Sequence, residues 1–145
     1  MLEIRERRAE DDPLLLDLWL RAVRATHTFL TEEDVALLLP LVRDEALPGL
    51  EVWVCEEESP PLGFIGLTGA EVNMLFVDPG AHRRGVGRQL LDHAKALRGC
   101  LSLDVNEQNP GALAFYFACG FRVVGRSELD GQGRPFPLLH LTECP

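Results

Sequence analysis

Apolar and polar residues recur with two periods along the chain, and the switches between them predict its helices and strands. Period-2 segments predict strands at residues 2–4, 51–57, 62–69, 71–77, 101–105, 121–126 and 136–141. Period-3.6 segments predict helices at 13–26, 31–48, 89–98 and 110–118. This order predicts one mixed, mostly antiparallel sheet of six to seven strands flanked by about four helices. We therefore expect an α/β (α+β) fold with residues 1–145 as one domain.

Local signals mark where several of these elements start and stop. Asp12-Pro13 is typical of a helix N-terminus, and Thr31 followed by Asp34 resembles a capping box. Asn109-Pro110 predicts another helix start, and Gly120 predicts the corresponding end. No repeat or internal linker interrupts the pattern.

Charge is divided unevenly between the two halves of the chain. Residues 1–71 carry 16 acidic and 6 basic side chains, whereas residues 72–145 carry 7 and 8. A chain of net charge -9 without a basic face is not typical of nucleic-acid binding. No apolar run approaches a membrane span, and the first residues resemble no secretory signal. We expect a cytoplasmic protein whose scattered cysteines, Cys55, Cys100, Cys119 and Cys144, are free thiols, and no metal site.

The segment 82–88, His-Arg-Arg-Gly-Val-Gly-Arg, lies between a predicted strand and a predicted helix. A helix start presents unpaired N–H groups and the positive end of the helix dipole. Gly85 and Gly87 allow close backbone approach, and three arginines add positive charge. The pattern predicts a phosphate or diphosphate site, although a glycine-rich helix start with solvated arginines remains the alternative. A Walker loop would need Gly-Lys-Ser/Thr, and Leu90 occupies the third glycine position of the dinucleotide fingerprint.

The same segment, with the strand before it, resembles the acetyl-CoA signature of the GNAT N-acetyltransferase superfamily. The matching residues are Leu75-Phe76-Val77-Asp78-Pro79 and His82-Arg83-Arg84-Gly85-Val86-Gly87. A second block, residues 106–121, is similar to the family's Asn…Ala…Tyr-x-x-x-Gly-Phe segment. The element order fits along nearly the whole chain, and both ends resemble a small bacterial YjaB-type branch. His82 is a departure, because Arg or Gln is usual there.

The resemblance implies acetyl-CoA as cosubstrate and an acyl transfer to an amine. It implies that the strand at 71–77 separates from the strand at 101–105 so that its backbone binds the pantetheine arm. The cofactor residues that it implies are Leu75, Phe76, Val77, Arg83, Arg84, Gly85, Val86, Gly87, Arg88, Asn106 and Asn109. For Asn109, N-capping before Pro110 is an equally good interpretation.

Tyr116 occupies the family's general-acid position, although its flanking phenylalanines also suit mere packing. Glu71 is the first candidate for the general base, because the histone-acetylating branch has a glutamate at this offset; a solvated residue is the alternative. His27 is the second candidate base, and a surface histidine or one next to a helix N-cap is the alternative. His93 and His140 are interpreted as structural, and no Ser-His-Asp or Cys-His arrangement is expected.

The acceptor side is expected at His27, Phe29 and Asn73. The acidic first half predicts a negative wall and a small cationic amine as acceptor, with Phe29 and Trp53 as apolar or cation–π contacts. We expect a monomer or homodimer. Two other functions remain open: a non-catalytic acyl-CoA-binding module, and a nucleotide-dependent enzyme such as a kinase, which the missing Lys-Ser/Thr disfavours.

Overall fold

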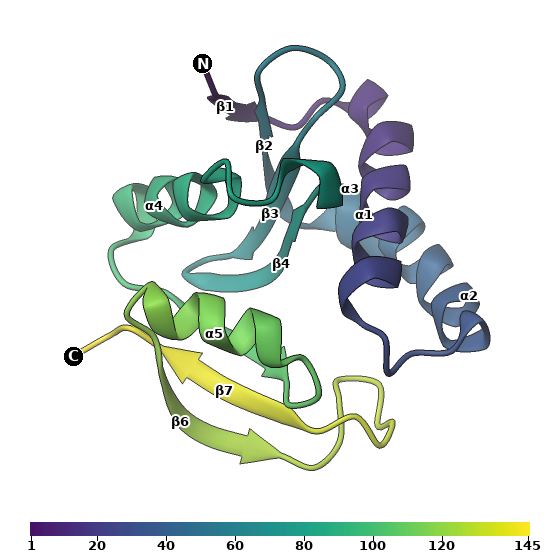
Figure 1. Ribbon diagram of the computed structural model, residues 1–145, viewed down its shortest axis with the longest axis vertical. Helices are drawn as coiled ribbons and strands as arrows, with labels where there is room; N and C mark the ends of the chain where they lie inside the picture. Colours follow the sequence, from purple (N-terminus) through teal and green to yellow (C-terminus); the bar gives the residue numbers. More distant parts are fainter.

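Seven strands form one sheet in the order β1-β2-β3-β4-β5-β7-β6 in the structure, a computed structural model that describes residues 1–145 (Figure 1). The strands are β1 (Glu3–Glu6), β2 (Glu51–Glu56), β3 (Gly63–Thr68), β4 (Glu71–Val77), β5 (Ser102–Asn106), β6 (Arg122–Ser127) and β7 (Leu138–Thr142). The helices are α1 (Asp12–Thr26), α2 (Glu32–Leu41), α3 (Leu47–Gly49), α4 (Val86–Arg98) and α5 (Pro110–Ala118). Only β4 and β5 pair in parallel. The predicted mixed sheet is confirmed.

Local sequence signals fix the helix ends much as predicted. Thr31 caps α2: its Oγ1 accepts the Asp34 N–H at 3.1 Å, and Asp34 Oδ2 accepts the Thr31 N–H at 2.9 Å. The capping box is therefore confirmed. Asp12 lies inside α1 rather than capping it, so this helix starts one residue earlier than predicted. The predicted helix to residue 48 continues from α2 through a π-helical turn at Val42–Ala46 into α3.

Two apolar clusters join the helices to the sheet, one on each face. One joins α1 and α2 to the sheet and includes Leu18, Trp19 and Phe64. The other joins α4 and α5 to the opposite face and includes Leu91 and Val105. None of the helices combines the length and apolar character needed to span a bilayer.

The parallel pair at the centre of the sheet separates after two residues. Glu71 pairs with Ser102 and Val72 with Leu103, and no further pairs follow. On its other edge, β4 stays paired with β3, except that the register shifts so that Asn73 has no partner. This bulge bends β4 away from β5. The separation of these two strands is therefore confirmed.

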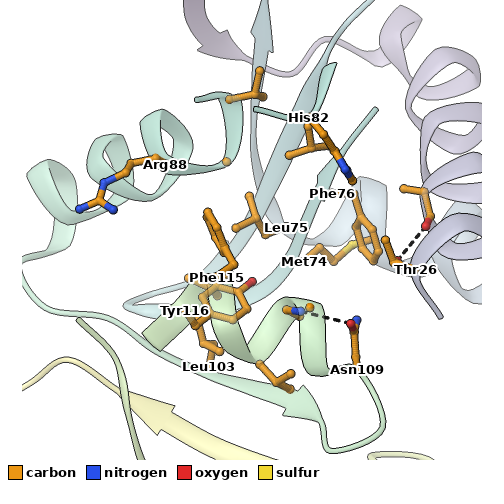
Figure 2. A pocket seen from close by; sticks show the side chains of 18 of the residues that line it. Thr26, Met74, Leu75, Phe76, His82, Arg88, Leu103, Asn109, Phe115 and Tyr116 are labelled. Atoms are coloured by element: carbon orange, nitrogen blue, oxygen red, sulfur yellow. Dashed lines mark hydrogen bonds between the residues drawn. The ribbon is translucent and has the colours of Figure 1, made fainter. Parts of the chain in front are cut away.

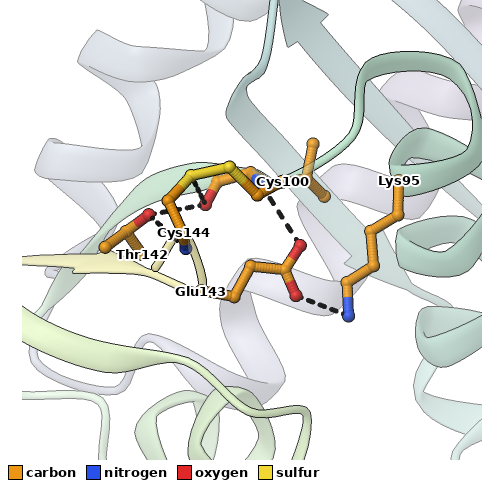
Figure 3. The surroundings of a disulfide bond; sticks show 6 residues. Lys95, Cys100, Thr142, Glu143 and Cys144 are labelled. Atoms are coloured by element: carbon orange, nitrogen blue, oxygen red, sulfur yellow. Dashed lines mark hydrogen bonds and ion pairs between the residues drawn. A yellow bond between two sulfur atoms is a disulfide. The ribbon is translucent and has the colours of Figure 1, made fainter.

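The cysteine prediction is wrong for one pair. Cys100 and Cys144 form a disulfide with Cα atoms 5.1 Å apart (Figure 3). The pairing of Ser102 with Thr142 in β5 and β7 places the two cysteines side by side just outside the sheet. A scattered sequence spacing hides this contact, because it depends on which strands are neighbours. Cys55 and Cys119 are free and buried, as expected of inert thiols.

Candidate active site

A cleft of about 840 Å³ opens where β4 and β5 separate. Side chains from β4, β5, α1, α5 and the β4–α4 loop line it (Figure 2). On one side, α5 contributes Phe115 and Tyr116, and Leu75 of β4 lies toward them. On the other side, α1 contributes Thr26, and Phe76 of β4 lies toward it. The cleft therefore joins the two faces of the sheet through the gap between the strands.

The β4–α4 loop forms one end of this cleft. Asp78 begins the loop, and its Oδ1 accepts the Gly80 N–H at 2.8 Å. Arg83 has φ of 71° and Gly85 has φ of 80°, so two left-handed residues shape the turn before α4. Only glycine adopts this conformation without strain. Arg83 is therefore held in a strained backbone conformation, in a turn whose backbone faces the cleft.

The first N–H groups of α4 have no acceptor within the protein. The first helical hydrogen bond runs from the Gln89 N–H to the Gly85 carbonyl at 3.0 Å, and the four N–H groups from Gly85 to Arg88 are unbonded. All four residues line the cleft. Unpaired N–H groups at a helix start attract anions. The predicted diphosphate position is therefore available to a ligand.

The two glycines of this segment serve different purposes. A side chain at Gly85 would meet no atom within 4 Å, so its positive φ is what requires glycine. A Cβ at Gly87 would lie 3.1 Å from Phe115 Cζ and 3.6 Å from Val77 Cγ2. Gly87 therefore lets the start of α4 pack against α5 and β4, in addition to exposing its backbone.

The three arginines do not act together. Arg83 and Arg88 line the cleft, as does His82, and Arg88 Nη1 is 3.7 Å from the sulfur of Cys119. Arg84 lies outside the cleft, paired with Glu57 on the β2–β3 loop. This pair lowers the pKa of Glu57 to about 2.

The two walls of the cleft carry the other predicted cofactor residues. Leu75, Phe76 and Val77 line it from β4, and Asn106 and Asn109 line it from the β5 side. Asn109 Oδ1 accepts the Ala112 N–H at 3.2 Å, which confirms it as the N-cap of α5 (Figure 2). Its side-chain amide nitrogen has no partner in the protein, so N-capping and a ligand contact are compatible.

Tyr116 projects from α5 into the cleft with 9% of its surface exposed (Figure 2). Its ring contacts Phe115 and Phe121 edge-on, with centroids 5.2 and 5.6 Å apart. Burial raises the pKa of its hydroxyl, and no protein group accepts or donates a hydrogen bond there. The phenol is therefore a protonated donor with no internal partner.

His27, at the C-terminal end of α1, lines the cleft opposite α5. The Thr26 hydroxyl donates to the Ala22 carbonyl at 2.8 Å and is also 2.8 Å from His27 Nδ1. Because its single proton is used on the carbonyl, this hydroxyl accepts from Nδ1–H. Nε2 is then left with a free lone pair. Burial also lowers the pKa of His27, which keeps the ring neutral.

Other predicted acceptor-side residues lie at the margin or outside. Phe29 does not line the cleft; it packs between His27 and Phe136, with centroids 5.5 and 5.8 Å away. Asn73 lines the cleft, whereas Glu71 is exposed outside it and accepts a hydrogen bond from Asn73 at 2.9 Å. Trp53 is edge-on to His93 at 4.4 Å, away from the cleft, so its predicted acceptor contact is wrong.

Sequence reasoning missed a hydrogen-bonded Ser–His–Asp group. His140 Nδ1 lies 2.5 Å from Asp104 Oδ1, and His140 Nε2 lies 2.7 Å from the Ser127 hydroxyl. The three residues come from β7, β5 and β6, and only the strand order brings them together.

Asp104 also lines the cleft, and it is the only carboxylate to do so. The predicted negative wall from residues 1–71 is therefore wrong. No group of three or more His, Cys, Asp or Glu side chains is placed so that it could hold a metal ion.

Comparison with known proteins places this geometry in a family. A model of the acetyltransferase (GNAT) domain matches residues 48–123. The chain is 44% identical over 142 residues to the peptidyl-lysine N-acetyltransferase YjaB of Salmonella typhimurium, covering 97% of each chain. It is 36% identical over 122 residues to the peptidyl-lysine N-acetyltransferase YiaC of Escherichia coli, covering 83% and 84% of the two chains.

Solved structures agree with this placement. The solution structure of apo-form YjaB from Escherichia coli superimposes with a TM-score of 0.92 at 43% identity, covering 99% of this chain and 97% of that one. The PaiA N-acetyltransferase of Thermoplasma acidophilum, solved in complex with coenzyme A, shares the fold with a TM-score of 0.77 at 20% identity, covering 97% and 98%. The cleft, its helix start and its aligned relatives lead to one conclusion: this chain belongs to the GNAT family of acetyltransferases, which use acetyl-CoA.

Proposed function

We propose that this enzyme transfers the acetyl group of acetyl-CoA to the side-chain amine of lysine in a peptide or protein. The observation that carries the proposal is one continuous cleft, with unbonded N–H groups at one end and the Tyr116 hydroxyl in its wall. The 44% identity to a protein named as a peptidyl-lysine N-acetyltransferase supports this acceptor class over the small free amine expected from charge alone.

In this proposal the diphosphate binds the N–H groups of residues 85–88, with Arg83 and Arg88 beside it. The pantetheine arm follows the edge of β4 that β5 leaves unpaired after Val72. Backbone amides there can bond the arm as a neighbouring strand would. Asn106 and the free amide of Asn109 face the same space from the opposite wall. Arg84, bound to Glu57, takes no direct part.

The chemical step begins with a neutral amine. A lysine ammonium has an ordinary pKa of about 10.4, so deprotonation near neutral pH costs about 4 kcal/mol. His27 lines the cleft, and its Nε2, which has a free lone pair, takes this proton. Glu71 is less suited to do so, because it lies outside the cleft and accepts a hydrogen bond from Asn73. The nitrogen then attacks the thioester carbonyl carbon.

The second half of the step breaks the C–S bond. The sulfur leaves as a thiolate and receives a proton from the Tyr116 hydroxyl, which the raised pKa keeps protonated. The products are acetyl-lysine and the free thiol of coenzyme A. The attacking nitrogen, which still carries one extra proton, loses it to solvent, and Tyr116 is reprotonated from solvent. His27 releases its own proton, so one proton leaves per turnover and the enzyme is unchanged.

A comparison of acceptors tests the proposal. Thiol release from acetyl-CoA is followed with peptides that contain a single lysine and a blocked N-terminus, and with small diamines at equal concentration. We expect kcat/KM to be higher for the peptides, with acetylation on the lysine nitrogen by mass spectrometry. A clear preference for the diamines would instead return the acceptor to the small cationic class.

A further inference from the structure

Asp104 holds a singular position among the acidic residues. It is the only carboxylate that lines the cleft, although the chain has 23 acidic residues. Those of the first half are commonly engaged elsewhere, for example Asp11 with Arg5 and Asp34 with Arg134. Any cationic group that enters the cleft therefore meets one negative partner.

Strand alternation places Asp104 on the acceptor side of the sheet. Its neighbours Leu103 and Val105 are buried in the cluster with α4 and α5. Asp104 consequently faces the opposite side, where α1 carries His27 to the cleft. The cleft is thus positive at the start of α4, with Arg83 and Arg88, and negative at β5.

His140 and Ser127 hold this carboxylate in place. An ionised carboxylate only accepts, so His140 Nδ1–H donates to Asp104 Oδ1 at 2.5 Å, and Nε2 accepts from the Ser127 hydroxyl at 2.7 Å. The second oxygen, Oδ2, has no hydrogen-bond partner in the protein. One oxygen is therefore fixed while the other remains free for a ligand.

The backbone of β6 makes room for the histidine ring. A Cβ at Gly125 would lie 3.1 Å from His140 Cδ2. The register between β6 and β7 also shifts between Val123 and Gly125, directly beside this contact. Three strands thus contribute to the position of one carboxylate.

The same bonds resemble those of a nucleophilic Ser–His–Asp triad, but their placement favours another role. In such a triad the serine faces the substrate, whereas here Ser127 and His140 lie off the cleft and only Asp104 lines it. In this hydrogen-bonded series the carboxylate is the group that meets the substrate, and the serine holds the histidine in place.

We propose that Asp104 is the counter-ion that receives the ammonium group of the acceptor, and that His140 and Ser127 are positioning residues for it. The inference rests on the proposed function and specifies how the cleft selects a cationic amine before His27 removes its proton. A charge-assisted contact of this kind raises affinity for lysine over neutral side chains.

The first experiment separates acceptor binding from chemistry. Asp104→Asn keeps the shape and removes the charge; we expect KM for a single-lysine peptide to rise about tenfold, as loss of a charge-assisted hydrogen bond would cause. We expect kcat and the acetyl-CoA Kd to stay within about twofold. Asp92→Asn, an exposed site on α4 that does not line the cleft, makes the same charge change and should leave KM unchanged.

The second experiment tests the positioning residues. His140→Phe removes the donor to Asp104, whereas His140→Asn retains a side-chain N–H. We expect KM to rise several-fold for His140→Phe and to be largely restored in His140→Asn, with thermal unfolding confirming that both fold. Wild-type KM should also rise with salt, and this dependence should weaken in Asp104→Asn.

Several outcomes overturn the inference while leaving the proposed function standing. An unchanged KM in Asp104→Asn does so, and so does a fall in kcat at constant KM, which would make Asp104 a base. Ester hydrolysis that disappears in Ser127→Ala would identify a nucleophile instead of an anchor. Failure of the wild-type enzyme to acetylate any lysine peptide would refute the proposed function itself.

Discussion

Burial acts on two residues of the cleft in the same sense, toward the neutral form. It raises the pKa of Tyr116 and lowers that of His27. A neutral phenol donates a proton and a neutral imidazole accepts one, so each residue is held in the state that its proposed role requires. The sequence alone left Tyr116 divided between packing and catalysis, because a helix between phenylalanines suits both.

Replacement of Tyr116 by Phe isolates the hydroxyl. The ring contacts with Phe115 and Phe121 remain, so acetyl-CoA affinity should hardly change. Turnover should fall roughly 10²-fold, within the range for general acids. Steady-state kinetics with calorimetry would check this, and full activity in the variant would reduce Tyr116 to a packing residue.

Protonation of His27 should make the free energy of unfolding depend on pH. Its pKa lies below the ordinary 6.5 when folded, so below about pH 6.5 the unfolded chain binds a proton that the folded chain does not. The free energy of unfolding should therefore decrease as pH falls from about 6.5 toward the folded pKa. Urea unfolding at about pH 7 and pH 5.5 should show a smaller decrease for His27→Asn. Equal decreases in both proteins would contradict the assignment.

At the scale of elements, the site depends on where β4 leaves β5 and where α4 begins. The extra residue Asn73 bends β4, and left-handed residues at Arg83 and Gly85 turn the chain into the helix. The capping signals and the glycine-arginine segment were readable from the sequence because each is a local pattern. The direction of Arg84 was not, since it depends on Glu57 on a distant loop.

The helix start is tested by Gly87→Glu. A side chain there places bulk against Phe115 and negative charge beside the unbonded N–H groups. Acetyl-CoA affinity should fall at least about 10-fold, as one lost charge-assisted contact or more would cause. Gln89→Glu adds the same charge outside the cleft and should have a much smaller effect. Calorimetry that shows equal affinity in a folded Gly87→Glu variant would contradict the placement of the diphosphate.

At the scale of the whole molecule, strand order decides what sequence reasoning misses. The order β5-β7-β6 brings Cys100 to Cys144, and it brings Asp104, His140 and Ser127 into one hydrogen-bonded group. These residues are far apart in the chain, and no local period marks them. The net charge of the first half was misleading for the same reason, because none of its carboxylates lines the cleft.

The disulfide ties the end of β7 to the segment between α4 and β5 (Figure 3). Glu143 reinforces it, bonding Lys95 at 2.6 Å and the Leu101 N–H at 3.2 Å. A disulfide that closes a loop of this length stabilises by roughly 2–4 kcal/mol. Dithiothreitol should lower the Tm of the wild-type protein and leave that of Cys144→Ser unchanged. Equal behaviour of the two proteins would mean that the bond contributes nothing to stability in solution.

The central claim is that this cleft carries an acetyl group from acetyl-CoA to a lysine amine. The most direct test measures two products in one reaction: the thiol of coenzyme A and the acetyl-lysine of a single-lysine peptide with a blocked N-terminus. We predict that they form in equal amounts and that both decrease together in Tyr116→Phe. Acetyl-CoA binding without thiol release would indicate a non-catalytic module, and thiol release without acetyl-lysine would indicate a hydrolase; either result would contradict the account.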